Sequence, residues 1–152
     1  GHVIEHILTG AGCEGGDVTP DGMQVWNTNR AGDTVSVIDV STNSVVDVMP
    51  CRGFPIRVRV TPDGALALVS CMNGDELVIW DIGSRREVGR MRTGAAPMGI
   101  LIDPGGITAY VANTKSNTVS MIDLPSLSIK GSIRPGRTPD GMGLSAPTGQ
   151  SP

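Results

Sequence analysis

The stretch YVANTKSNTVSMID at residues 110–123 decides the fold, because the same pattern occurs twice before it at a fixed interval. It aligns without a gap with WNTNRAGDTVSVID at residues 26–39 and with LVSCMNGDELVIWD at residues 68–81. The starts differ by 68 − 26 = 42 and by 110 − 68 = 42 residues. The chain is therefore built from repeats of one structural unit.

The 42-residue frame divides the chain into three complete and two partial units. The complete units are residues 9–50, 51–92 and 93–134. We expect residues 1–8 to be the last strand of a preceding unit, with Gly1 and His2 compatible with a remnant of tag cleavage. We expect residues 135–145 to be the first strand of a further unit, and residues 146–152 to be a tail without a strand.

Each unit contains four short apolar runs separated by polar turns. The first run ends in VTPDG at residues 18–22 and 60–64 and in IDPGG at residues 102–106. Pro fixes φ near −65° and the following Asp-Gly or Gly-Gly pair supplies positive φ, so these segments are turns. Without helical periodicity, the pattern predicts an all-β antiparallel meander. Four strands in a period of this length are typical of a β-propeller blade.

The units resemble the YVTN β-propeller repeat. The naming motif stands here as WNTN, LVSC and YVAN, and it is followed by the TVSVID-type segment and preceded by the TPDG turn. The second unit departs from the motif at Cys71, and the third replaces TPDG by DPGG. The resemblance implies a propeller, and a location outside the cytoplasm, in the periplasm or on the cell surface.

Composition excludes several classes of protein. The chain has 152 residues, of which 39% are hydrophobic and 18% charged, so it is globular rather than disordered. Its net charge of −3 provides no general attraction to nucleic acid. No apolar run reaches the roughly 18 residues that a membrane-spanning helix needs.

Three blades do not close a ring, since known propellers have about four blades or more. The partial units cannot combine into one blade, because the first and fourth strands of a blade are not neighbours. Either the chain is a piece of a propeller with about six to eight blades, or copies of it associate. We expect self-association that covers the open blade faces, with two copies forming a ring of about six blades.

Three cysteines without C-x-x-C spacing exclude a disulfide framework, a zinc ribbon and covalent haem attachment. Cys13 and Cys51 fall in the same kind of loop in neighbouring units. A cross-link between these two residues therefore stays open, beside the alternative that both are free thiols.

No catalytic residue, metal ligand or cofactor site is predicted. Asp39, Asp81 and Asp123 recur once per blade, too far apart to share an ion, so we interpret them as residues that bond the backbone at strand ends. The only histidines, His2 and His6, would lie roughly 13 Å apart on a strand. Hydrolytic and phosphate-binding motifs are absent, so an enzymatic activity is not expected.

The second unit carries the main irregularities. Arg57 and Arg59 stand in its first strand, and Asp17 is the equivalent of Arg59 one unit earlier. We favour a structural ion pair between Asp17 and Arg59, buried between blades; the alternative is an anion site formed by Arg57 with Arg52. Phe54 stands in a loop, where it contacts either a ligand, another chain or only its own loop.

Loops between the fourth and first strands share one face of a propeller with loops between the second and third strands, and this face is where we expect a ligand or partner. Its predicted members are Asn29, Arg30, Arg52, Phe54, Arg57, Met72, Asn73, Asn113 and Lys115. Their chemistry favours a protein or a small anionic ligand.

The leading functional hypothesis is a non-enzymatic binding or scaffolding module. One alternative is a fragment of a larger propeller that accompanies a quinone- or haem-dependent dehydrogenase, whose cofactor ligands come from other domains. Another is a lyase or lactonase acting on the channel face, which the position of the two histidines disfavours. The resemblance implies the fold far more than the function.

Overall fold

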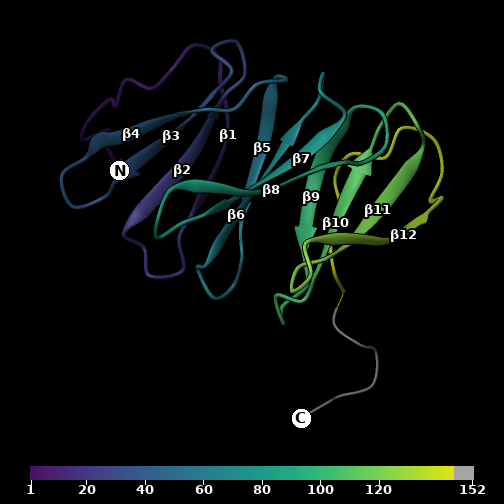
Figure 1. The fold of residues 1–152 in the computed structure, drawn as a ribbon. Coiled ribbons are helices and arrows are strands. Elements are labelled where there is room, and N and C mark those ends of the chain that lie inside the picture. The colour runs from purple at the N-terminus through teal and green to yellow at the C-terminus, as the bar shows by residue number, and fades with distance from the viewer. Residues whose placement is uncertain (146–152) are drawn as a thin grey trace.

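The computed structural model describes residues 1–145 and contains twelve strands and no helix in them, hence no helix that could span a membrane (Figure 1). The first sheet has β1 Cys13–Val18, β2 Gln24–Asn29, β3 Thr34–Asp39 and β4 Ser44–Pro50. The second has β5 Pro55–Val60, β6 Leu66–Cys71, β7 Glu76–Asp81 and β8 Arg86–Arg92. The third has β9 Pro97–Ile102, β10 Thr108–Asn113, β11 Thr118–Asp123 and β12 Ser128–Ile133.

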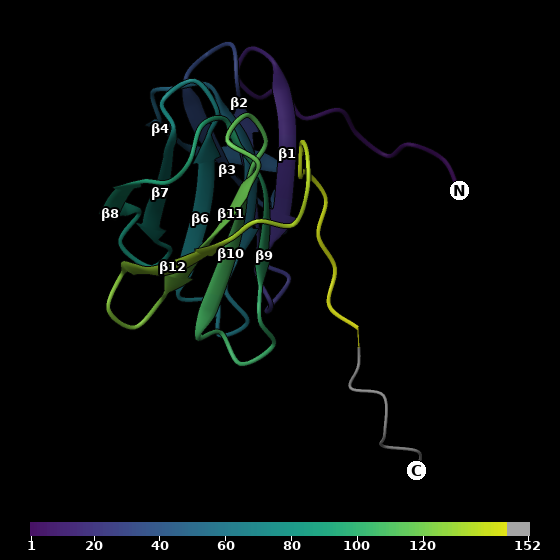
Figure 2. The same ribbon diagram turned by 90° about the vertical axis from the view of Figure 1, so that its right-hand side faces the viewer.

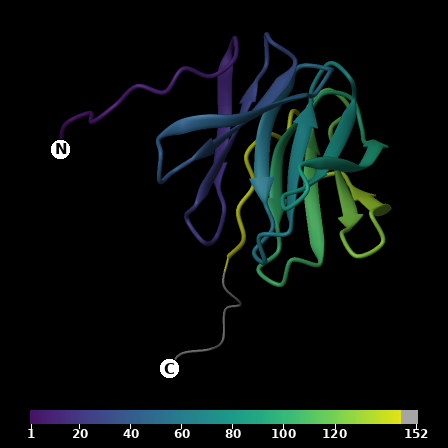
Figure 3. The same ribbon diagram turned by 60° about the vertical axis from the view of Figure 1, so that its left-hand side comes forward.

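Each sheet is a four-stranded antiparallel meander in chain order, and the prediction of an all-β fold is confirmed. We call the sheets blades 1, 2 and 3. They stand side by side and fan out around an axis (Figure 3). Strand β5 contacts β1 and β2, and β9 contacts β5 and β6. The first strand of each blade thus packs on the first two strands of the blade before it, which is the arrangement of consecutive propeller blades.

The pairing register repeats with the sequence period. Gln24 pairs with Asp39, Leu66 with Asp81, and Thr108 with Asp123 in successive blades. The pairing of third and fourth strands also shifts at equivalent places in every blade. Because one residue of slippage would turn every side chain to the opposite face, the conserved register keeps the same faces buried in all three blades.

The core lies between the sheets. In blade 2, Leu68, Leu77 and Ile79 pack towards blade 3, while Val69 and Val78 pack towards blade 1. All five side chains are fully buried. Alternate residues of β6 and β7 are therefore apolar on both faces, as expected for a sheet covered on both sides. The core is filled despite the low aromatic content of the chain, because Val, Ile and Leu occupy most of these positions.

The turns after the first strands form as their sequence predicts. Gly22 and Gly64 have φ of 73° and 72°. The Asp21 carboxylate accepts hydrogen bonds from the Thr19 hydroxyl at 2.6 Å and the Met23 amide at 2.9 Å. Asp63 accepts the same two bonds in blade 2. In blade 3 the DPGG variant has Gly105 in place of this Asp. Asp103, two residues earlier, accepts the equivalent bond from the Ile107 amide at 2.8 Å.

Asp39, Asp81 and Asp123 end the third strands and bond the turns that follow, which confirms their interpretation as strand-end residues. Asp81 accepts hydrogen bonds from the Ser84 hydroxyl at 2.6 Å and the Ser84 amide at 2.7 Å. These bonds to the ionised form hold the pKa of the Asp81 carboxyl below its usual value, and similar bonds do so for Asp39 and Asp123.

A repeated hydrogen bond between a side chain of one blade and a backbone amide of the next joins consecutive blades, and we call it the clasp. It consists of an acceptor side chain in the loop between the second and third strands and the backbone amide that begins the next blade. Asp33 Oδ1 accepts from the Phe54 amide at 2.8 Å, and Asp75 Oδ1 accepts from the Ala96 amide at 2.9 Å. The acceptors stand 42 residues apart and share φ near +50° (50° and 57°).

Residues 3–8 form no strand, contrary to the expectation for the end of a preceding blade. A fourth strand is stabilised by backbone hydrogen bonds to a third strand, and the described chain has no such partner before β1. Figure 2 shows this N-terminal segment extending away from the sheets. Residues 146–152, predicted to be a tail, lie outside the described residues.

Residues 135–145 also form no strand, but their start occupies the place of a next blade. Asn117 Oδ1 accepts from the Thr138 amide at 2.8 Å, which extends the clasp to a third member. The carbonyl oxygen of Asp140 lies against Gly99 as that of Ile56 lies against Gly15, leaving no space for a side chain at either glycine. The strand is not completed, because the second strand that would pair with it is not among the described residues.

The strand-end carboxylates predict a dependence of stability on acid. Their folded-state pKa is lowered, so their stabilisation is present above the unfolded-state pKa of about 3.9 and is lost as pH falls through the folded value. We expect Asp81→Asn to lower the Tm at pH 7 by a few degrees and to weaken its decrease below about pH 4. Calorimetry across this range measures both effects, and Glu5→Gln, on the exposed N-terminal segment, should follow the unaltered protein. Identical acid curves for Asp81→Asn and the unaltered chain would contradict the assignment.

The clasp predicts a specific response to substitution at Asp75. Asp75→Ala leaves the Ala96 amide without its acceptor, and we expect the free energy of unfolding to fall by about 1–3 kcal/mol. Asp75→Asn should be tolerated, because asparagine accepts the same bond and adopts positive φ readily, as Asn117 does in blade 3. Denaturant titration of the two variants provides the comparison. Equal losses in both would show that the bond to the amide is not what matters.

Candidate functional site

The two kinds of loop predicted to share a face are joined by backbone hydrogen bonds. In blade 2 the Met72 amide donates to the Phe54 carbonyl at 3.1 Å, and the Asn73 amide donates to the Gly53 carbonyl at 3.0 Å. Blades 1 and 3 have the same pair of bonds, which include the amides of Arg30 and Lys115. We call this end of the molecule the loop face. Its backbone is held rigidly, so its side chains differ between blades without disturbing the fold.

The Phe54 side chain lies next to a residue of the preceding blade. Its φ of 63° belongs to a position where the other blades have Gly12 and Ala96, both also with positive φ. The guanidinium of Arg30, from blade 1, lies 5.6 Å from the centre of the Phe54 ring. The ring is half-buried, and the contact is a cation–π interaction across the blade boundary.

Three charged side chains meet at the boundary between blades 1 and 2, and we call them the Glu14 cluster. Arg30 Nη1 lies 3.1 Å from Glu14 Oε2, and Arg57 Nη1 lies 3.2 Å from Glu14 Oε1. The arginine side chains are 44% and 39% exposed. Two guanidinium groups sharing one carboxylate leave a net positive charge, so the cluster favours an anion over a cation.

Glu14 was missed by the sequence analysis, although it is central to the cluster. It stands in the bulged part of β1, where pairing shifts between Cys13 and Gly16. The period predicts which residues are equivalent, but Glu14 meets Arg57, whose equivalent in blade 1 is Gly15. Contacts between non-equivalent residues depend on the rotation of one blade relative to the next. The repeat pattern of the sequence does not specify this rotation.

Asp17 and Arg59 lie close together at the same boundary. Arg59 Nη1 is 3.7 Å from Asp17 Oδ1, and the other Asp17 oxygen accepts a hydrogen bond from the Val60 amide at 2.9 Å. The Arg59 side chain is 52% exposed, so the pair is not buried between the blades as expected. An exposed pair at this distance contributes about 0–1 kcal/mol. The bond to the Val60 amide is the stronger link between blades.

The two motif asparagines do not belong to the exposed loop face. Asn29 and Asn113 are fully buried, which corrects their placement among the ligand-facing residues. Asn29 Oδ1 accepts from the Gly10 amide at 3.0 Å, and its Nδ2 donates to Ser36 Oγ at 2.8 Å. Asn113 Nδ2 donates to the hydroxyls of Thr118 and Ser120 at 3.1 and 2.9 Å. Both side chains therefore lie inside their own blades, away from the exposed loop face.

The remaining predicted members are accessible. Arg52, Asn73 and Lys115 are exposed, and Met72 is half-buried. Among the described residues, Arg52 makes no ion pair. Within residues 1–145, no three His, Cys, Asp or Glu side chains gather closely enough to hold a metal ion.

The cysteine arrangement differs from the one left open by the sequence. Cys13 is exposed and its thiol lies 3.2 Å from Asn27 Oδ1. Cys51 is buried, and its sulfur lies 3.6 Å from that of Cys71 rather than near Cys13. The reason is that the side chain at position 51 points into the core between blades 1 and 2, where the end of β6 also lies.

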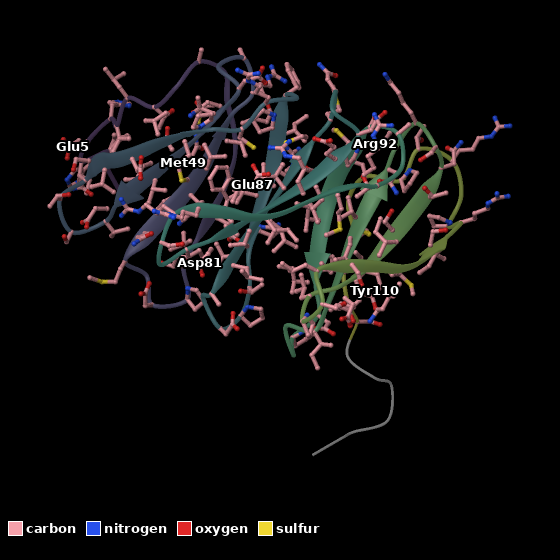
Figure 4. All side chains as sticks on the ribbon, in the orientation of Figure 1. Glu5, Met49, Asp81, Glu87, Arg92 and Tyr110 are labelled. Atoms are coloured by element: carbon pink, nitrogen blue, oxygen red, sulfur yellow. The ribbon has the colours of Figure 1, made fainter. Side chains whose placement is uncertain are left out.

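A second candidate surface is the face of blade 3 that points away from blade 2. It holds an open cavity of about 560 Å³ between the sheet and residues 135–144. The sheet contributes Leu101, Tyr110, Val119 and Ile133. Figure 4 labels Tyr110 on blade 3. The lining is mainly apolar, as in a surface that packs against another sheet.

Comparison with solved structures places the chain among propellers. It matches Kuenenia stuttgartiensis hydrazine synthase with a TM-score of 0.80 and 28% identity, over 90% of this chain and 40% of that one. It matches the WD40 repeats of RRP9 with a TM-score of 0.76 and 14% identity, over 83% of this chain and 39% of that one. The chain thus spans about 40% of these proteins.

No curated protein matches the chain in sequence. The family model described as YNCE-like beta-propeller matches residues 2–105, which is more than half of the chain. That segment covers blades 1 and 2 and the start of blade 3. Together with the three repeated sheets, the match shows that the chain belongs to the YNCE-like beta-propeller family.

Proposed function

We propose that the chain is a non-enzymatic binding or scaffolding module that works within a ring, where further blades cover its two open faces. The observation that carries this proposal is the apolar face of blade 3. Its side chains occupy positions that are core positions in the other two blades. The same face in a finished propeller packs against a following blade.

Each residue on the open face of blade 3 can be compared with the residues at the equivalent positions of blades 1 and 2. Tyr110 and Met121 are half-buried, and Ile133 is 46% exposed. Their equivalents in blade 2 pack against blade 3, and their equivalents in blade 1 pack against blade 2. Those equivalents are Leu68, Ile79 and Met91 in blade 2, and Trp26, Val37 and Met49 in blade 1. The blade 3 face therefore has the chemistry of a core without the sheet that would complete it.

The opposite open face, on blade 1, is more polar. It carries Asn27 where the equivalent positions are Val69 and Val111. Because the two open faces differ, two copies would associate head to tail, with blade 3 of each copy against blade 1 of the other. Two such contacts close a symmetric ring of about six blades.

The association predicts a mass of 2 × 15.8 = 31.6 kDa for the purified chain in solution. Size exclusion with light scattering measures this mass directly. Tyr110→Asp places a charge in the apolar face and should shift the mass towards 15.8 kDa, whereas Lys115→Asp on the loop face should leave the dimer intact. A monodisperse 15.8 kDa species for the unaltered chain would exclude self-association.

A second candidate is a segment of a larger propeller protein, in which the missing blades belong to the same polypeptide. The match to hydrazine synthase at 28% identity favours it, since this chain aligns with only 40% of that protein. Sequencing the gene on both sides of the coding segment tests the idea. Additional 42-residue units in frame would support a longer propeller, and stop codons at both ends of the segment would exclude it.

A small anionic ligand at the Glu14 cluster is the binding activity that the loop face favours. Arg30 and Arg57 offer guanidinium groups that Glu14 only partly neutralises, and Arg52 is exposed on the same face. Carboxylates and phosphates suit the fork geometry of arginine. The proposal includes a location outside the cytoplasm, which is supported by the family resemblance alone.

Calorimetric titration with inorganic phosphate tests the anion site. We expect Arg57→Ala to weaken binding at least about tenfold, because a charged hydrogen bond contributes about 1.5–3 kcal/mol. Arg134→Ala, an exposed residue after β12, is the matched control and should bind like the unaltered chain. Equal binding by both variants would exclude the cluster as the site.

A further inference from the structure

The second blade replaces a polar contact of the repeat by two cysteines. Cys71 stands 42 residues after Asn29 and 42 before Asn113, and Cys51 stands 42 residues after Thr9 and 42 before Thr93. Both departures thus occur in the same unit. In the structure the two sulfurs face each other at 3.6 Å.

The asparagine that Cys71 replaces links three segments in blade 1 and two in blade 3. Asn29 Oδ1 accepts from the Gly10 amide in the incoming loop, and its Nδ2 donates to Thr34 and Ser36 of β3. Asn113 donates to Thr118 and Ser120 in blade 3 at 3.1 and 2.9 Å.

In blade 2 the partners of the amide are missing as well. The positions of Thr34 and Ser36 are taken by Glu76 and Val78, and Val78 has no hydroxyl to accept a bond. The side chain at the end of β6 meets that of residue 51, at the start of the incoming loop, through the Cys71 and Cys51 sulfurs. The set of changes in this blade therefore replaces a hydrogen-bonded link by a pair of sulfur atoms.

Both cysteine side chains are fully buried in the core between blades 1 and 2. The sulfur–sulfur bond of a disulfide is about 2.05 Å long, so bond formation requires an approach of roughly 1.5 Å. Cys13 does not compete, because it lies on the surface beside Asn27.

We propose that Cys51 and Cys71 are a site of disulfide formation, which covalently ties the loop entering blade 2 to the end of β6. The oxidant is a disulfide, either a small one such as oxidised glutathione or that of a thiol–disulfide oxidoreductase. One cysteine thiolate attacks the oxidant disulfide and releases one thiol. The second thiolate then attacks the protein sulfur of the mixed disulfide and releases the other thiol. The protein loses two protons and two electrons, and the oxidant is reduced to two thiols.

The burial of the two cysteines determines when the disulfide can form. The adjacent Cys51 sulfur and burial raise the pKa of the Cys71 thiol, so the reactive thiolate is disfavoured in the folded chain. Oxidation therefore takes place during folding, before blade 1 covers the pair. Once formed, the bond is shielded from external thiols, and its reduction requires unfolding.

Refolding of the chain from denaturant tests the proposal, once with a mixture of reduced and oxidised glutathione and once with excess reductant. Remaining thiols are alkylated in denaturant, and peptides are mapped by mass spectrometry. After oxidative refolding we expect a linked peptide pair containing Cys51 and Cys71, with Cys13 as the alkylated cysteine. The oxidised protein should have a Tm about 5–10 °C above the reduced one.

Variants separate this bond from general effects of the oxidant. Cys13→Ser should form the same link and show the same Tm difference, whereas Cys51→Ala should lose both. Three alkylated cysteines after oxidative refolding, or links that mainly involve Cys13, would overturn the proposal. The mapping of the unaltered chain decides the outcome even if Cys51→Ala fails to fold.

Discussion

The structure depends on one constraint: a sheet with apolar side chains on both faces must be covered on both sides. Blade 2 meets this condition, because Leu68, Leu77 and Ile79 pack on blade 3 while Val69 and Val78 pack on blade 1. A single sheet cannot satisfy it, and two sheets packed together leave two faces open. Repetition around an axis satisfies it for every blade once the ring closes.

The same constraint explains why departures from the repeat occur in matched sets. Loss of the turn Asp in blade 3 is accompanied by Asp103, which accepts the equivalent backbone bond. Loss of the motif asparagine at Cys71 is accompanied by Cys51. Each blade contacts its neighbours through a fixed set of positions, so a change at one position leaves a group unpaired unless a second change follows.

Strands, register and turns could be predicted from the sequence because they are local and recur every 42 residues. The placement of side chains at the blade boundaries could not. The polar character of Asn29 and Asn113 suggested exposure, but both are buried, and both donate hydrogen bonds to hydroxyl groups on the third strand of their own blade. Glu14 and the partner of Cys51 depend on the rotation between blades, and this rotation leaves no periodic signal in the sequence.

Backbone hydrogen bonds hold the loops in place, whereas the loop side chains are available for binding. The fold therefore says little about the ligand. Loops on the loop face are held by amide–carbonyl bonds and by the clasp, which Asp33 and Asp75 provide through their carboxylates. The other loop side chains are therefore free to differ without loss of stability, and propellers vary in function at such loops. In this chain the variation is concentrated at the boundary of blades 1 and 2, where two arginines share Glu14. Binding specificity is thus best sought at that boundary, and assembly at the apolar face of blade 3.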